Sequence, residues 1–262
     1  NTDCEAAGVA VFLMGTGTGR RNANGRLEHG GRWLNAAQWP LPESREMALY
    51  LHPKGELSVD APTVAQASLS YQSDPDHPVP TLGGALTSGA PIFAGGAFDQ
   101  WENADFFGAN GDGRALSSRD DVLTFQTPPL PHDLVVAGPI RVELWVESDG
   151  PDTDFTAKLV DVYPPSDDYP QGYAMNITDG IFRCRYRQAW DAPTLLTPGE
   201  RFPITLEPFA TCNLFKRGHR LRVDIASSNF PHFDVNPNSG EPEGQAFNKR
   251  IATNTVHMGA LH

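Results

Sequence analysis

Hydrophobic and polar residues alternate with a period of two along much of the chain. In residues 141–147, Val142, Leu144 and Val146 fall on one face and charged residues on the other. Residues 220–225 alternate in the same way. Because successive side chains of a strand point to opposite faces of its sheet, both segments are predicted to be strands with one buried face.

Further strand patterns recur through the sequence, separated by residues that favour turns. They cover residues 9–14, 49–52, 67–71, 122–126, 155–163, 173–177, 181–187 and 202–209. Turns are indicated at residues 149–151, 178–180, 198–199 and 217–218, each of which contains Gly. No segment shows a 3.6-residue period, so about ten short strands without intervening helices predict an all-β sandwich or barrel.

Two stretches interrupt the strand pattern. Residues 83–119 are rich in Gly, Ala, Phe and Asn, and residues 236–243 form a second loop of Gly, Pro and Asn. A loop as long as the first, inside a compact domain, is usually functional or packed against another segment. Since no internal repeat or linker-like tract is found, we expect one β-sandwich domain over residues 61–262, preceded by a less regular segment over residues 1–60.

The composition is that of a globular chain. Of its 262 residues, 39% are hydrophobic and 20% are charged, and the net charge is −12. Such a charge repels phosphate backbones and anionic lipid surfaces, so neither nucleic acid nor a membrane is an expected partner. No apolar run approaches the roughly 18–20 residues that span a bilayer. We expect a soluble protein and leave open whether it is cytoplasmic or secreted.

The sequence carries no recognisable nucleophile–base–acid set. The motif GxSxG, which holds the nucleophile of α/β-hydrolases, does not occur, and Ser227 and Ser228 lack a strand–turn–helix setting. The glycines of residues 15–19 follow a predicted strand, but no amphipathic helix follows them, as a phosphate-binding loop would require. We therefore expect no catalytic residue and no cofactor.

Metal sites are not supported either. Carboxylates cluster in residues 149–154 as in a calcium loop, but the bidentate Glu of an EF-hand is missing, and a solvated turn is the simpler interpretation. The histidines show no HxH or HExxH spacing, and the three cysteines form no CxxC motif. Cys184 and Cys212 lie in apolar strand patterns and are expected to be buried free thiols.

Two further patterns leave a binding role open. Arg183, Arg185 and Arg187 share one face of a predicted strand, where solvation or pairing with neighbouring acids is expected and an acidic partner is the alternative. Five tryptophans are scattered along the chain, and core or interface packing is simpler than sugar stacking. They are Trp33, Trp39, Trp101, Trp145 and Trp190.

Particular segments resemble one hydrolase family. Residues 148–164, 179–187, 209–221 and 227–236 are similar to signatures of the C-terminal non-catalytic domain of cocaine esterase and X-Pro dipeptidyl-peptidase-like (CocE/NonD) serine hydrolases. Upstream, residues 12–15, 39–42, 74–84 and 119–123 resemble the approach to that domain. The matches follow one another in order over nearly the whole chain.

The resemblance implies a jelly-roll-like β-sandwich, similar to galactose-binding domains, with long irregular loops. It also implies a two-part enzyme, in which an α/β-hydrolase catalytic domain in the same or a companion chain holds Ser, His and Asp. The substrate would be a small-molecule ester, amide or peptide. Residues 1–60 would lead from that missing domain, and the sandwich would lack its last strand. A homo-oligomer is left open.

In this family the loop that follows two glycines, Gly83 and Gly84 here, can reach the substrate. The side chains that we expect to line the shared cleft are Leu86, Thr87, Phe98 and Trp101. Residues 85–88 are less apolar than in cocaine-esterase-like members, which argues against a benzoyl-type acyl pocket. The alternative function is a free-standing jelly-roll module that binds carbohydrate or another protein.

Overall fold

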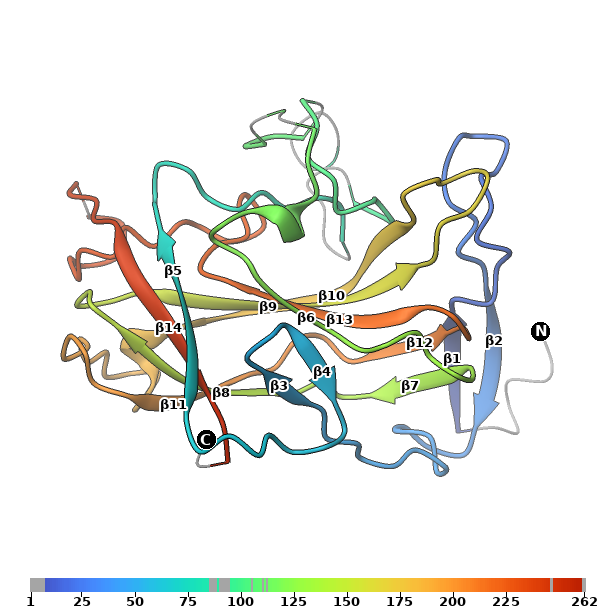
Figure 1. Ribbon diagram of the computed structural model, residues 1–262, viewed down its shortest axis with the longest axis horizontal. Coiled ribbons are helices and arrows are strands. Elements are labelled where there is room, and N and C mark those ends of the chain that lie inside the picture. Colours follow the sequence, from blue (N-terminus) through green and yellow to red (C-terminus); the bar gives the residue numbers. More distant parts are fainter. Residues whose placement is uncertain are drawn as a thin grey trace.

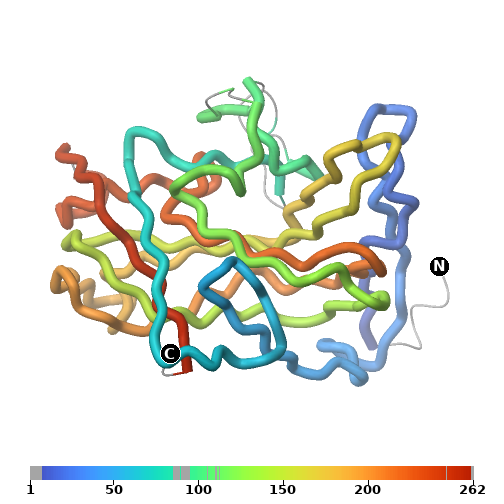
Figure 2. The backbone as a smooth tube through the Cα atoms, in the orientation of Figure 1, coloured from blue at the N-terminus to red at the C-terminus, as the bar shows by residue number. Residues whose placement is uncertain are grey.

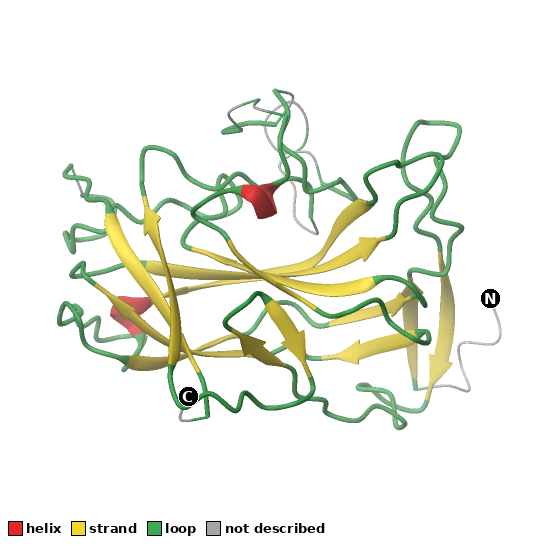
Figure 3. Cartoon of the chain, in the orientation of Figure 1, coloured by secondary structure: helices red, strands yellow, loops and turns green. Residues whose placement is uncertain are grey.

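The computed structural model describes residues 8–84, 89, 95–104, 106–109, 111, 113–245 and 247–260. Strands and loops make up nearly all of this part of the chain, with two short 3₁₀ helices, η1 (Leu116–Ser118) and η2 (Cys184–Tyr186) (Figure 3). This content confirms the predicted jelly-roll-like β-sandwich with long irregular loops. None of the helices in the described residues is long and apolar enough to cross a membrane.

The strands follow one another as predicted for an all-β chain, at these bounds: β1 (Val9–Met14), β2 (Gly31–Ala36), β3 (Tyr50–His52), β4 (Glu56–Ser58), β5 (Ala67–Ser73), β6 (Leu123–Gln126), β7 (Leu134–Gly138), β8 (Val142–Ser148), β9 (Asp154–Tyr163), β10 (Tyr173–Arg183), β11 (Phe202–Leu206), β12 (Thr211–Phe215), β13 (Arg220–Ala226) and β14 (Ala252–Met258).

These strands form three sheets that enclose one main core (Figure 1). The largest sheet has the order β10-β9-β13-β6-β4-β3, and the others have the orders β11-β8-β14-β5 and β2-β1-β12-β7. Phe155 and Ile225 from the largest sheet pack in the same cluster as Val146 and Val256 from β8 and β14. All four side chains are fully buried, so the two sheets form a sandwich over a close-packed interior.

The strand β8 shows why the sequence pattern predicts this layer. Leu144 and Val146 are buried while Glu143 and Trp145, on the other face, are exposed. The strand β9 differs, because nearly all of its residues are buried on both faces. Phe155 and Ala157 point into the main core, and Thr156 and Lys158 lie on the opposite face beneath another segment.

That covering segment is the long irregular stretch between β5 and β6. We call the described residues within 77–122 the roof segment, and they lie above β9 and β13 in Figure 1, with η1 as their one helical turn. Its apolar side chains Val79, Leu82, Leu116 and Val122 form a small second core with Ala226 of β13. The expectation that this stretch packs against something is confirmed, since it packs against the largest sheet.

Two predicted strands are in fact one. Residues 173–177 and 181–187 were expected to flank a turn at residues 178–180, but β10 runs through that turn and pairs with β9 over its whole length, with a bulge between Asn176 and Thr178. Gly180 has a packing role: a Cβ there would lie 3.1 Å from the backbone of Pro208. The expectation of a strand to residue 187 is also wrong, because η2 begins at Cys184.

The first 60 residues contribute β1 to β4. β1 pairs with β12 in parallel, and β4 pairs with β6 in parallel. The division of the chain at residue 60 and the missing last strand stay predictions. At the other end, β14 is inserted between β8 and β5, and β5 has no other neighbour in its sheet.

Candidate functional site

Backbone hydrogen bonds fasten the roof segment to the loop that follows β13 and to the largest sheet. The N–H of Thr81 donates to the carbonyl of Phe230 at 2.7 Å, and the N–H of Phe230 donates to Val79 at 2.9 Å. In the middle, the N–H of Gln100 donates to Ala174 of β10, also at 2.9 Å. These bonds give an irregular segment a fixed position over the sheet.

An ionic cluster lies inside the roof segment. Arg119 donates to Glu102 at 2.8 Å, to Asp121 at 2.7 Å and to the carbonyl of His77 at 2.9 Å. Burial alone would lower the pKa of Arg119, but the carboxylates of Asp121 and Glu102 outweigh it and hold the pKa above its ordinary value. The arginine therefore ties three parts of the roof segment together as a permanent cation.

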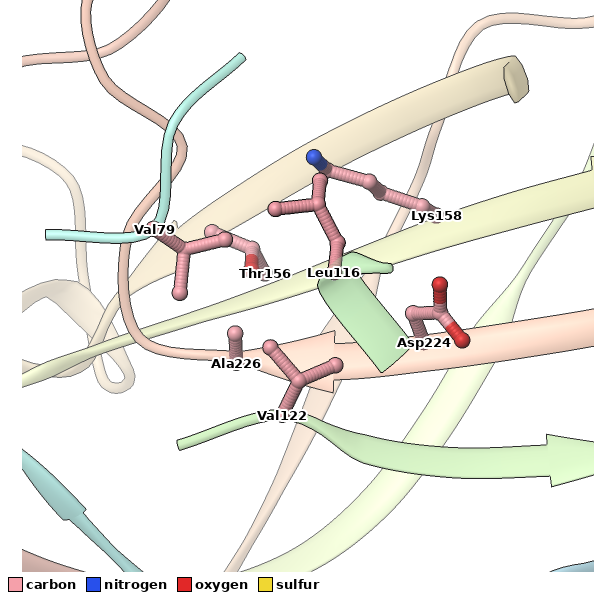
Figure 4. A pocket seen from close by; sticks show the side chains of 7 residues that line it. All are labelled: Val79, Leu116, Val122, Thr156, Lys158, Asp224 and Ala226. Atoms are coloured by element: carbon pink, nitrogen blue, oxygen red, sulfur yellow. The ribbon is translucent and has the colours of Figure 1, made fainter. Parts of the chain in front are cut away.

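Lys158 of β9 lies beneath the roof segment. Its side chain is buried at a cavity of about 10 Å³, which Asp224 of β13 and Leu116 of η1 also line (Figure 4). The amine has no hydrogen-bond partner among the described residues. Burial lowers the pKa of Lys158, against the opposing effect of Asp179 and Asp224. The cavity has room for about one water molecule and is far too small for a substrate.

The predicted cleft residues lie on the roof segment as far as the structure describes them. Phe98 packs edge-on against Phe106 at 5.0 Å between ring centroids, and the Arg26 guanidinium lies 4.1 Å above the Phe98 ring. Trp101 is 37% exposed and forms an isolated antiparallel β-bridge with Ala115. Leu86 and Thr87 lie outside the described residues. The lining of a shared cleft by these four side chains stays a prediction.

Phe98 is held where three segments meet. The loop between β1 and β2 and the turn between β9 and β10 lie side by side (Figure 2), joined by a hydrogen bond of 3.0 Å from Arg21 to the carbonyl of Asp168. The hydroxyl of Tyr173 on β10 donates to the carbonyl of Ala97 at 3.2 Å. Sequence reasoning missed these neighbours, because nothing local links the loop to the roof segment.

His29, near the end of the loop between β1 and β2, anchors that loop to β9 and β12. Nε2 of His29 lies 2.9 Å from Oδ1 of Asn213, and Nδ1 lies 2.6 Å from the hydroxyl of Tyr163. Because the amide oxygen only accepts, Nε2 carries the proton and Nδ1 accepts from Tyr163. Burial lowers the pKa of His29, against the hydrogen bond to Asn213, so the ring is held neutral.

Of the carboxylates in residues 149–154, Asp149 is exposed, as expected for a solvated turn, but the other two are not. Asp152 and Asp154 are fully buried, which corrects that expectation. Arg185 donates to Asp152 at 2.8 Å, Arg183 donates to Asp154 at 2.9 Å, and Asn236 donates to both carboxylates. The two anions are buried because these donors satisfy them.

The arginine stripe is confirmed in one part and wrong in another. Arg183 pairs directly with Asp154 across the β9–β10 ladder, as expected for neighbouring strands. Arg185 and Arg187 lie on or after η2 and share no strand face with it. Cys184 and Cys212 are buried free thiols, as predicted.

The sequence matches the family of X-Pro dipeptidyl-peptidase C-terminal non-catalytic domains over residues 5–262. The chain belongs to this family, as the resemblance of its motifs predicted. Cocaine esterase of Rhodococcus sp. (strain MB1 Bresler) is 36% identical over 242 residues, which are 88% of this chain and 38% of that protein.

Two solved structures are similar to this chain over the same extent. An aminopeptidase from a marine sediment archaeon, Thaumarchaeota archaeon, is 30% identical with a TM-score of 0.75, and the match covers 88% of this chain and 37% of that one. An α-amino acid ester hydrolase is 30% identical with a TM-score of 0.73, and the match covers 87% and 37%. The chain thus spans less than two fifths of each relative.

Proposed function

We propose that this chain packs on an α/β-hydrolase catalytic domain and forms one wall of its substrate pocket through the roof segment. The observation that carries the proposal is the exposure of aromatic side chains on a braced frame: Trp101 is 37% exposed and Phe107 is 51% exposed. The Arg119 cluster holds that frame from inside. Exposed aromatic side chains on a rigid support are typical of surfaces that another domain or a ligand covers.

The chemistry would reside in the other domain. The relatives are named as an esterase, an aminopeptidase and an ester hydrolase, all of which cleave acyl bonds. A pocket between two domains buries a ligand and excludes water better than an open surface does. The roof segment would contribute apolar surface around Phe98 and so select the acyl or leaving group. The substrate would be a small ester, amide or peptide.

The proposal is tested on the full-length gene product. A fluorophosphonate probe should label that protein and leave the isolated 262-residue chain unlabelled. Phe98→Ala in the full-length protein should raise KM or change acyl preference across a set of activated esters and amides. Phe247→Ala is the matched control, because that side chain is 93% exposed and lies between β13 and β14, outside the roof segment. Kinetics that are unchanged by Phe98→Ala on every substrate would contradict the proposal.

One observation favours a second candidate function, sugar binding. Trp190 is 72% exposed, stacks on Tyr186 at 5.6 Å and meets Phe182 edge-on at 5.8 Å. A rigid indole with a free face can stack on a pyranose ring. Affinity electrophoresis in gels that contain soluble polysaccharides tests this candidate: retardation that Trp190→Ala abolishes supports it, and unchanged mobility in every gel contradicts it.

A further inference from the structure

Arg26 occupies an unusual position beside the predicted cleft. Its guanidinium carbon lies over Phe98, 4.1 Å from the ring centroid. Its only hydrogen bond from a side-chain nitrogen in the described residues is a long one, 3.4 Å from Nη2 to the carbonyl of Ala97. The cation therefore contacts an aromatic ring while the residue as a whole is exposed to solvent.

No carboxylate pairs with Arg26 in the part of the chain that the structure describes. Arg119 of the roof segment, by contrast, binds the carboxylates of Glu102 and Asp121, and the guanidinium of Arg21 donates to the backbone carbonyl of Asp168. The chain carries 32 acidic and 20 basic residues, so acidic partners are abundant. An exposed guanidinium that none of the described acids pairs with is available to an anion from outside the chain.

The chain also builds a support for this cation. The side-chain oxygen of Asn22 accepts hydrogen bonds from the N–H groups of Asn24 and Arg26, at 2.9 and 3.0 Å, which closes a tight turn. The next residue, Leu27, is buried with Tyr163 and Tyr173. The side chain of Arg26 therefore extends from a fixed backbone. Binding a ligand there costs less conformational entropy than it would if the ligand also had to order a flexible segment around the arginine.

We propose that Arg26 binds a carboxylate of the substrate, and that the pocket bordered by Phe98 selects esters, amides or peptides that carry a free carboxylate near the bond to be cleaved. This inference rests on the proposed function, because Phe98 must border the pocket. Arginine suits the task, since its planar fork matches a carboxylate with two parallel hydrogen bonds.

The test uses the full-length enzyme and two matched substrates, one with a free carboxylate and the other with that group as its methyl ester. Arg26→Gln should raise KM for the carboxylate substrate by about tenfold and leave KM for the methyl ester within about twofold, as the loss of a charge-assisted contact would. Arg20→Gln is the control, because it removes the same charge from the opposite arm of the loop. The selectivity of the parent enzyme should fall with added NaCl.

The outcomes separate this inference from the proposed function. If Phe98→Ala changes the kinetics of both substrates but Arg26→Gln changes the two equally or not at all, Arg26 does not bind the carboxylate and the inference fails alone. If neither substitution has an effect, the pocket lies elsewhere and both fail. If Arg26→Gln raises KM only for the carboxylate substrate but Arg20→Gln does the same, the effect comes from long-range charge, and a direct contact with Arg26 is overturned.

Discussion

Glu102 accepts a hydrogen bond from Arg119 at 2.8 Å, and neither side chain is exposed by more than 4%. Both residues belong to the roof segment, so this ion pair is internal to an irregular stretch of chain. The ion pair gives the segment a fixed shape, which a regular strand or helix obtains from its backbone hydrogen bonds. We expect the exposed aromatic side chains of the same segment to depend on it.

Breaking that pair should destabilise the domain. Glu102→Ala leaves Arg119 buried with one carboxylate fewer, and we expect a loss of about 3 kcal/mol in the free energy of unfolding, measured by urea denaturation. Glu143→Ala, on the exposed face of β8, should cost less than about 0.5 kcal/mol. Equal effects of the two substitutions would show that the ion pair does not brace the roof segment.

Lys158 should make the stability depend on pH. Its pKa is lowered by burial, so between that value and the ordinary 10.5 the unfolded chain binds a proton that the folded chain does not. Stability from this group therefore increases as the pH rises through that window. Lys158→Met, of similar shape, should stabilise the domain at pH 7 and remove that rise. The readout is the urea midpoint at pH 7, 8 and 9, and parallel curves for the two proteins would refute the expectation.

His29 should contribute in the same direction at lower pH. Because its pKa lies below 6.5 in the folded chain, the unfolded chain takes up a proton first as the pH falls, and stability is lost below about pH 6.5. His29→Gln should lessen that loss. The pKa itself can be read from the shift of the His29 ring protons in NMR, and a midpoint at or above 6.5 would contradict the neutral, Tyr163-bonded ring.

Asp154→Asn should be more damaging than its small change in shape suggests. The carboxylate receives hydrogen bonds from Arg183 and Asn236, and an amide cannot accept them all. The Arg183 cation would also lose its buried counter-ion, so we expect about 3 kcal/mol of lost stability. Asp234→Asn is the control, since that partner of Arg183 is exposed. Thermal denaturation of the two variants compares them, and similar melting temperatures would argue against a structural role for the buried pair.

The sequence predicts the sandwich well wherever one face of a strand meets solvent. β8 alternates between buried Val146 and exposed Trp145 because only one of its faces is covered. β14 gives no such signal: its inward residues include the buried Asn254, whose amide donates to Thr153 and Ser227. A polar side chain in the core hides the period of two, and the pattern alone misses the strand.

The contacts of the candidate site are harder to predict from the sequence pattern. The turn expected at residues 178–180 is absent because pairing with β9 and the close approach of Pro208 to Gly180 override the local signal. The contact between Arg26 and Phe98 joins two loops without regular structure, and no periodicity or spacing links them. The resemblance to a family pointed to Phe98, whereas only the three-dimensional structure revealed the cation above it.

The position of β14 has a consequence for how the domain is made. β5 emerges from the ribosome early, yet its neighbour in the sheet is β14, which is synthesised last among the described strands. Until residues 252–258 appear, the hydrogen-bonding edge of β5 has no strand to receive it, and a nascent chain must keep that edge from pairing with another molecule. Completion of this sheet is therefore a late event in synthesis, and chains cut short before β14 should aggregate.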